Sequence, residues 1–453
     1  TVNIEKRYMN SRNLIVLIAA AITLASCSIE KRINQQANKF LLKDSILSQA
    51  HIGIAVQDLE SQKWVYQFQS DKLFTPASNT KIVSCYTAMK YLPDHLPAAL
   101  VTELDTALLI TPTGDPSFLH PRFTSHPLYD YLKSTTKPIY LDGGNFFSLK
   151  WGHGWSWEDY AEDYMIERNA FPVYGNQVEW YQQRSKKENP TAPHDTVDVF
   201  MYSTPEINWK VDIGAPGKSF QVDRSPNENH FTLHEGKEKS SSTIVPFITN
   251  GLESAIELLK DTLHRSIAIA EREMVRSASL KTSTMITSQP TDSLLKDMMD
   301  RSDNFFADMC VEMVSQLTLK KMDEAAAINY ILKKEFSEMP QQPNWVDGSG
   351  LSRYNLFSPE DMIWILQKMK SDVGWERVKS VMPGAGSTNL KMYPAKNNDY
   401  IFAKTGTLNG VVCLSGFYLN KKNKWLAFSI MVNNHHTTSA SVRKKIANFL
   451  TAL

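Results

Sequence analysis

The stretch Thr75-Pro76-Ala77-Ser78-Asn79-Thr80-Lys81 decides how the rest of the chain is interpreted. A proline is typical of a first helical turn, because its missing N–H would have no hydrogen-bond partner there. Apolar residues follow at helical spacing and predict a helix with a buried face that runs to about Leu92. Ser78 and Lys81 stand three residues apart, so both side chains leave the first turn on one face. A serine hydroxyl becomes a good nucleophile when a neutral lysine amine removes its proton.

The spacing alone is weak support, because it is common in this chain. Ser-x-x-Lys occurs five times, starting at Ser28, Ser78, Ser134, Ser293 and Ser441. Context separates Ser78 from the others, since a predicted strand precedes it, a proline opens its helix and an apolar face follows. We therefore expect Ser78 and Lys81 to be catalytic, provided that partner motifs occur downstream.

Length and composition indicate a globular protein of more than one domain. The 453 residues exceed one ordinary core, and 42% of them are hydrophobic. The formal net charge of +1 gives no electrostatic reason to expect nucleic acid as a partner. Cys85, Cys310 and Cys413 lack the close spacing of zinc ligands, so we expect buried thiols, no metal and no cofactor.

The N-terminus predicts export. Residues 1–26 combine arginines with an apolar run that is too short for a comfortable membrane span. The run ends in Leu24-Ala25-Ser26-Cys27, which resembles a bacterial lipobox. We expect a lipoprotein signal peptide over 1–26 and a lipid anchor at Cys27, on the periplasmic side of a bacterial membrane, with the outer membrane as the expected one. The alternative is a cleaved signal with an incidental cysteine.

The two ends of the mature chain together predict an α+β fold. Alternating or continuous apolar runs separated by turn residues predict five strands, and a helix at 439–450 follows the last one. We expect these strands to form one antiparallel sheet flanked by helices: 51–58, 63–69, 400–408, 411–419 and 424–433.

The middle of the chain predicts an insertion. Residues 94–245 are rich in proline, glycine and aromatics and poor in long helical patterns, so we expect a largely β inserted region, with a possible second unit at 186–245. The main domain would then comprise 27–93 and 246–453. One long helix is predicted over Thr291–Gln316. The insertion is rich in tryptophan, which could form a sugar-stacking platform, although core packing is the commoner role: Trp151, Trp155, Trp157 and Trp180.

Two further motifs follow the first in a fixed order. Ser302-Asp303-Asn304 and Lys404-Thr405-Gly406 come after Ser78-x-x-Lys81, and this triple is the set found in β-lactamases and penicillin-binding proteins. Lys-Thr-Gly occurs once, whereas Ser-x-Asn also recurs elsewhere. The order of the three motifs is therefore more specific than any one of them.

With these motifs the chain resembles the class C low-molecular-mass penicillin-binding proteins, the D-alanyl-D-alanine carboxypeptidase and endopeptidase family, peptidase family S13. The resemblance covers nearly the whole mature chain and implies a penicillin-binding, β-lactamase-like fold with a long insertion after the first motif. It also rests on these shorter stretches: Pro76-Ala77-Ser78, Gly114-Asp115-Pro116, Gly154-Trp155-Ser156-Trp157, Asp347-Gly348-Ser349-Gly350-Leu351-Ser352-Arg353 and Lys404-Thr405-Gly406-Thr407-Leu408.

The resemblance implies a role for each residue around the nucleophile. Ser78 would attack the carbonyl between two D-alanines, and Lys81 would take its proton. Ser302 would relay a proton to the leaving amine, and Asn304 would hold Lys81 and the substrate amide. If Lys-Thr-Gly were absent, Ser302 and Asn304 could be only a helix cap.

The resemblance also implies a binding site for the substrate. Lys404, Thr405, Gly406 and Thr407 would bind the terminal carboxylate, and Lys404 would be the second cation that keeps Lys81 neutral. The backbone N–H groups of Ser78 and Thr407 would form the oxyanion hole. Arg353 could bind a substrate carboxylate, with a surface ion pair as the alternative.

The expected function is that of a serine D-Ala-D-Ala carboxypeptidase or D,D-endopeptidase, which acts on peptidoglycan stem peptides and is acylated by β-lactam antibiotics. The sequence leaves the balance between the two activities open. One alternative is a serine β-lactamase, although we find no recognisable base for deacylation. The other alternative is a non-catalytic, peptidoglycan-binding lipoprotein.

Overall fold

The computed structural model describes residues 31–186, 197–391, 393 and 400–453. The predicted signal peptide and the predicted lipid anchor at Cys27 lie outside these residues. Within the described ranges, no helix is both long and apolar enough to cross a membrane. Cys85, Cys310 and Cys413 are buried free thiols, as predicted.

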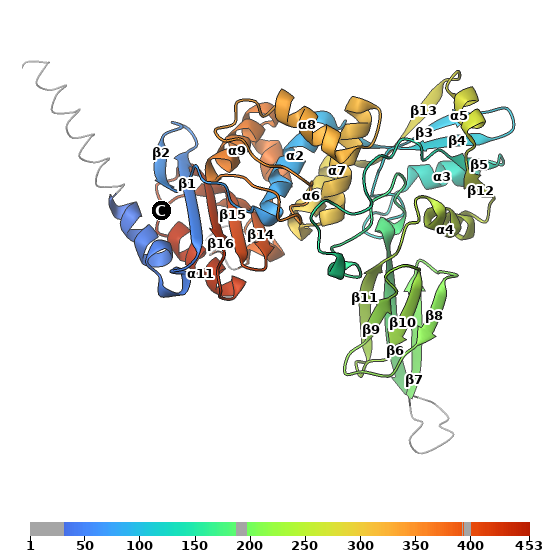
Figure 1. The fold of residues 1–453 in the computed structure, drawn as a ribbon, viewed down its shortest axis with the longest axis horizontal. Helices are drawn as coiled ribbons and strands as arrows, with labels where there is room; N and C mark the ends of the chain where they lie inside the picture. The colour runs from blue at the N-terminus through green and yellow to red at the C-terminus, as the bar shows by residue number, and fades with distance from the viewer. Residues whose placement is uncertain (1–30, 187–196, 392, 394–399) are drawn as a thin grey trace, which may run out of the picture.

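The central sheet contains strands from both ends of the chain (Figure 1). It is antiparallel and has the order β14-β15-β16-β1-β2, and His51 of β1 lies opposite Asn433 of β16. This confirms the predicted five-stranded sheet. Its strands are β1 (His51–Asp58), β2 (Trp64–Phe68), β14 (Ile401–Leu408), β15 (Val411–Leu419) and β16 (Trp425–Asn433).

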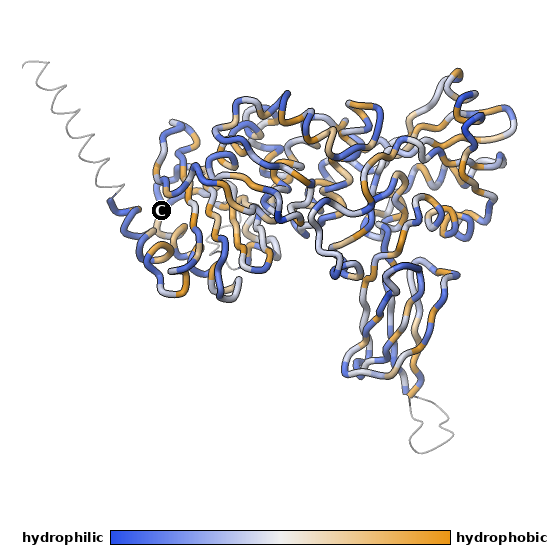
Figure 2. Tube along the Cα trace, viewed as in Figure 1, coloured by the Kyte–Doolittle hydropathy of each residue, from blue (hydrophilic) through white to orange (hydrophobic). Residues whose placement is uncertain are grey.

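Helices cover both faces of this sheet, which explains why β1, β15 and β16 are buried and largely hydrophobic over most of their length (Figure 2). Alternate side chains point to opposite faces: Cys413 belongs to the core that contains side chains of α2, α7 and α9, whereas Leu414 belongs to the core that contains side chains of α11 and η1. The first face is covered by α2 (Thr80–Tyr91), α6 (Thr291–Arg301), α7 (Asn304–Leu319), α8 (Glu324–Lys334), α9 (Pro359–Val373) and α10 (Trp375–Val381), and the second by η1 (Asn38–Leu42) and α11 (Ser439–Leu450).

The helix predicted over Thr291–Gln316 is two helices, so that prediction was wrong. Ser302 ends α6 in the left-handed conformation, with φ +61°. Asp303 then begins α7, because its side chain accepts a hydrogen bond from the backbone N–H of Phe306 at 2.9 Å. The break leaves Ser302 between the two helices, where it contacts Lys404, and puts Asn304 at the first residue of α7, where it contacts Lys81.

The inserted region contains a second sheet, of order β12-β5-β4-β3-β13, with three helices. Its last strand, β13, pairs with its first, β3. Because of this pairing, we propose that the insertion ends after Pro290 instead of at residue 245. The elements are β3 (His95–Glu103), β4 (Leu108–Pro112), β5 (Ile139–Leu141), β12 (Ile267–Ile269), β13 (Ser283–Pro290), α3 (Pro127–Ser134), α4 (Glu253–Leu263) and α5 (Arg272–Ala278).

A small all-β unit projects from this insertion, below the rest of the molecule in Figure 1. Two three-stranded sheets, β11-β6-β7 and β8-β10-β9, pack face to face, and Trp180 contacts Phe231 with ring centroids 5.1 Å apart. We propose that the unit begins at Gln177, where β6 begins. Its strands are β6 (Gln177–Lys186), β7 (Val197–Thr204), β8 (Lys210–Ile213), β9 (Gln221–Arg224), β10 (His230–His234) and β11 (Ser240–Pro246).

Candidate active site

The turn that carries Ser78 is fixed to the central sheet. A short 3-10 helix, η3 (Ala77–Asn79), leads into α2, and Ala77 has a φ of +49°, which is unfavourable for a residue with a β-carbon. The backbone N–H of Thr75 donates to Asn433 Oδ1 at 2.8 Å, and Asn433 Nδ2 donates back to the Thr75 carbonyl at 3.1 Å. These bonds hold the strained turn in place and fix the position of the Ser78 hydroxyl.

Lys81 lies at the centre of the three motifs. Its Nζ donates to Ser78 Oγ at 3.0 Å, to Asn304 Oδ1 at 2.7 Å and to the carbonyl of Ser349 at 2.7 Å. The side chain is fully buried, at 0% exposure. Three acceptors therefore fix the amine at hydrogen-bond distance from the hydroxyl that it would deprotonate.

Burial lowers the pKa of Lys81 to about 8, although the nearby carboxylates of Asp308, Asp347 and Asp303 act in the opposite direction. A free lysine has a pKa of about 10.4 and is almost entirely protonated at neutral pH. A substantial fraction of Lys81 is therefore neutral near pH 8 and able to accept a proton.

The second lysine of the site lies on the edge strand β14. Lys404 Nζ donates to Ser302 Oγ at 2.8 Å and to the Thr405 carbonyl at 3.0 Å. Burial lowers its pKa well below the usual value, and the charge of Lys81 lowers that pKa further. Two buried ammonium groups in one site disfavour each other, so the charge of Lys81 favours the neutral form of Lys404.

Two glycines allow the walls of the site to touch the Ser78 turn. A β-carbon at Gly406 would lie 2.5 Å from the Pro76 carbonyl oxygen and 3.1 Å from the Ser78 nitrogen. A β-carbon at Gly350, where φ is +81°, would lie 2.0 Å from the Ala77 carbonyl oxygen. Glycine is therefore required at both positions for β14 and the loop around Gly350 to approach the turn.

The loop that supplies the Ser349 carbonyl is held by Asp347. Its carboxylate accepts hydrogen bonds from the backbone N–H groups of Gly350 and Ser352, both at 2.7 Å, and from Trp155 Nε1 at 2.8 Å. Trp155 belongs to the tryptophan group that the sequence suggested as a stacking platform. In the structure it joins the insertion to this wall of the site.

A cavity of about 730 Å³ opens at Ser78. Arg353 lines this cavity and is exposed. Its Nη2 donates to the backbone carbonyl of Asn409 at 2.8 Å. Among the described residues Arg353 forms no ion pair, so the alternative of a surface ion pair is not seen there. Thr407 also lines the cavity and accepts a hydrogen bond from Arg443 of α11 at 2.7 Å. The lining is Ser78, Gly154, Ser156, Asp159, Tyr164, Asn304, Gly350, Leu351, Arg353, Thr407, Leu408 and Asn409.

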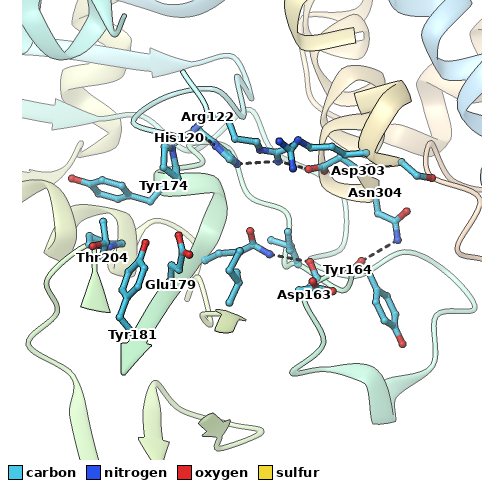
Figure 3. Close-up of a pocket in the computed structure, with 17 residues that line it drawn as sticks. His120, Arg122, Asp163, Tyr164, Tyr174, Glu179, Tyr181, Thr204, Asp303 and Asn304 are labelled. Carbon is cyan, nitrogen blue, oxygen red and sulfur yellow. Dashed lines mark hydrogen bonds and ion pairs between the residues drawn. The ribbon is translucent and has the colours of Figure 1, made fainter. Parts of the chain in front are cut away.

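A second cavity, of about 510 Å³, lies between the site and the small β unit (Figure 3). Tyr164 and Asn304 line both cavities, and Asn304 Nδ2 donates to the Tyr164 carbonyl at 3.1 Å. Ser302 lines only this second cavity. Sequence reasoning missed Asp159, Tyr164 and Arg443, because no local pattern indicates which distant loop reaches a cleft.

The structure therefore brings together Ser78, Lys81, Ser302, Asn304 and Lys404, all of which the sequence had proposed.

Comparison with known proteins gives the family. The model of the D-Ala-D-Ala carboxypeptidase 3 (S13) family matches residues 33–453. The chain belongs to this S13 family.

Individual S13 relatives agree with this result. The D-alanyl-D-alanine carboxypeptidase DacB of Haemophilus influenzae is 23% identical over 436 residues, which cover 88% of each chain. A crystal structure of penicillin binding protein 4 (dacB) from the same organism covers 92% of this chain and 99% of its own, with a TM-score of 0.70 at 19% identity. A structure of that protein complexed with a β-lactam gives a TM-score of 0.67 at 18% identity, covering 92% of this chain and 97% of its own.

The S13 match confirms the predicted family, and the structural similarity confirms the predicted fold class. The chain is therefore a hydrolase of the D-Ala-D-Ala carboxypeptidase type.

Proposed function

We propose that this protein cleaves the D-Ala-D-Ala bond of peptidoglycan stem peptides through an acyl-enzyme at Ser78. The observation that carries the proposal is the 3.0 Å hydrogen bond between Lys81 Nζ and Ser78 Oγ, in a site where burial lowers the pKa of Lys81 to about 8. A nucleophile and a neutral base at this distance are what acyl transfer requires.

Acylation begins when Ser78 Oγ attacks the carbonyl carbon of the penultimate D-alanine and gives its proton to Lys81. The carbon–nitrogen bond of the tetrahedral intermediate then breaks. Ser302 gives its hydroxyl proton to the leaving amine, and Lys404, which donates to Ser302 at 2.8 Å, can restore that proton. Water hydrolyses the ester in a second step, which releases the shortened peptide and regenerates Ser78.

The edge strand β14 offers the groups that the terminal carboxylate needs. Lys404 supplies a cation, and Thr405 and Thr407 supply hydroxyls. A bound carboxylate would stabilise the charged form of Lys404, whose pKa burial lowers in the free protein. The close approach at Gly406 supports an oxyanion hole made by the backbone N–H groups of Ser78 and Thr407.

The larger cavity also carries charges of both signs. Arg353 and Asp159 both line it, together with Ser78. A guanidinium recognises a carboxylate and a carboxylate recognises an ammonium group. This pair therefore supports a substrate in which one side chain of the stem peptide ends in both an ammonium group and a carboxylate.

Partners and location follow from the same proposal. The structure of the Haemophilus influenzae protein with a β-lactam supports β-lactams as covalent inhibitors of this chain. We propose that the protein is exported to the periplasm and anchored to the outer membrane through a lipid at Cys27. The sequence pattern at residues 1–27 supports this, and the mass of the mature N-terminal peptide would test it.

The test of function is incubation of the purified protein with defined muropeptides, followed by mass spectrometry of the products. Conversion of a pentapeptide to a tetrapeptide with free D-alanine is the expected result, and cleavage of crosslinked dimers would add endopeptidase activity. Rapid hydrolysis of penicillin without release of D-alanine would instead make the protein a β-lactamase. Binding of muropeptides without any product would make it non-catalytic.

A further inference from the structure

The outer face of the sheet β11-β6-β7 differs from its inner face. Along β6, Trp180 and Gln182 point inward and are buried, whereas Tyr181 and Gln183 point outward. The strand register places the outward residues in three cross-strand rows: Ile244, Glu179 and Thr204; Ser242, Tyr181 and Tyr202; Ser240, Gln183 and Phe200.

Over these three rows the outer face is aromatic and polar, and Asp198 follows in the next row, opposite Ser185. Phe200 is 58% exposed and Tyr202 is 45% exposed. The rings of Tyr181 and Tyr202 stack, with centroids 5.0 Å apart, and Gln183 Nε2 donates to the Tyr202 hydroxyl at 3.2 Å. Glu179 is the one charged residue among the three rows. Contiguous exposed apolar surface is typical of interaction sites, and here the exposed rings of Phe200 and Tyr202 lie on one strand beside Tyr181.

The face is continuous with the active site (Figure 3). Glu179, Tyr181, Thr204 and Ile244 line the smaller cavity, whose opposite wall includes Ser302 and Asn304. A polymer that enters the site can therefore lie along the cavity and onto this sheet. From Glu179 to Gln183 the strand adds about 14 Å of surface, and the Phe200–Tyr202 edge runs beside it.

The chemistry of the face selects a sugar. Aromatic rings offer flat apolar surfaces to the C–H faces of sugar rings, and amide and hydroxyl groups match sugar hydroxyls. Glu179 and Asp198 lie three rows apart on this face, so they do not form the cluster of carboxylates that a cationic peptide would need. We propose that the outer face of β11-β6-β7 binds the glycan strand of peptidoglycan, an inference that rests on the proposed function for the identity of the polymer.

Binding is tested without catalysis by using the mature Ser78→Ala chain. The chain is sedimented with purified sacculi and titrated with glycan strands from which an amidase has removed the peptides. The double substitution Phe200→Ala/Tyr202→Ala, which lies outside both cavities, should weaken both interactions about tenfold or more. The control is Ile213→Ala, because Ile213 is 65% exposed on β8 of the opposite sheet, and it should change neither.

Activity separates this inference from the proposed function. With Ser78 intact, the double variant should release D-alanine from a soluble single-stem muropeptide at the normal rate but digest sacculi about tenfold more slowly. Unchanged binding in the double variant would overturn the inference. So would a result in which free stem peptides displace the chain from sacculi and peptide-free glycan does not. Conversion of a dimer to a monomer by the substitutions would instead assign the face to self-association. If the unsubstituted chain binds glycan but releases no D-alanine, only the proposed function fails.

Discussion

The central sheet buries its aromatic and polar side chains, whereas the sheet β11-β6-β7 of the small β unit exposes some of them to solvent. In the central sheet Phe428 and Lys404 are fully buried, and Lys81 of the neighbouring helix α2 is fully buried as well. In the small unit Phe200 is 58% exposed. The first region changes the pKa of its groups by excluding water, and the second keeps an aromatic and polar surface open to solvent. Chemistry and polymer binding therefore need different environments within one chain.

The largest expected effect is in the active site, next to the central sheet. Ser78→Ala should abolish release of D-alanine, because no hydroxyl remains at hydrogen-bond distance from Lys81. A matched control is Ser293→Ala, since Ser293 opens another Ser-x-x-Lys stretch but is exposed on α6. Mass spectrometry of the muropeptide products measures both variants, and residual activity in Ser78→Ala would break the account.

Phe428→Ala should lower the free energy of unfolding by about 3–5 kcal/mol, because it leaves a cavity in the packed face beneath α11. Urea denaturation followed by circular dichroism measures this change. A loss below about 1 kcal/mol would show that the central sheet is packed less tightly than the structure indicates.

The pH dependence sharpens the comparison further. Burial lowers the pKa of Lys81 to about 8, so the neutral, proton-accepting form increases as the pH rises through that value. Acylation by a β-lactam should therefore be about fiftyfold faster at pH 8 than at pH 6. Lys81→Arg should be far slower at every pH and lose this dependence, because arginine stays protonated. A wild-type profile that is flat between these pH values would contradict a neutral lysine base.

The smallest effect belongs to the exposed face. Phe200→Ala should change the free energy of unfolding by no more than about 0.5 kcal/mol, because its ring makes little buried contact in the folded chain. Phe428→Ala and Phe200→Ala are the same substitution, one at a buried position and one at an exposed position, so their unfolding free energies can be compared directly. A loss of several kcal/mol would show that a partner or a second copy covers Phe200 in solution.

Much of this arrangement could be predicted from the sequence, for reasons that are local. The strands of the central sheet are long apolar runs bounded by turn residues. The three motifs have a fixed spacing within each motif and follow one another in a fixed order. The helix break at Ser302 was missed because the apolar pattern continues across it, although Asp303 is a good N-cap residue. Asp159 and Tyr164 could not be placed, since only the tertiary fold brings their loop to the cleft.

The small β unit shows the same limit. In β6, Trp180 and Tyr181 are adjacent and the inward position 182 holds a polar glutamine, so the sequence does not show which aromatic ring faces outward. Trp180, one of the residues suggested for sugar stacking, is buried against Phe231, whereas Tyr181 and Tyr202 lie on the open face. Cross-strand register decides this, and it depends on strands far apart in the chain.

The central claim is that Ser78 is the nucleophile on which the three motifs converge, and one measurement tests it most directly. The mature protein is acylated with penicillin, digested and analysed by mass spectrometry to locate the adduct. The account predicts a single adduct on the peptide that contains Ser78, and no adduct in Ser78→Ala. An adduct on any other residue, or an unchanged adduct in that variant, would contradict it.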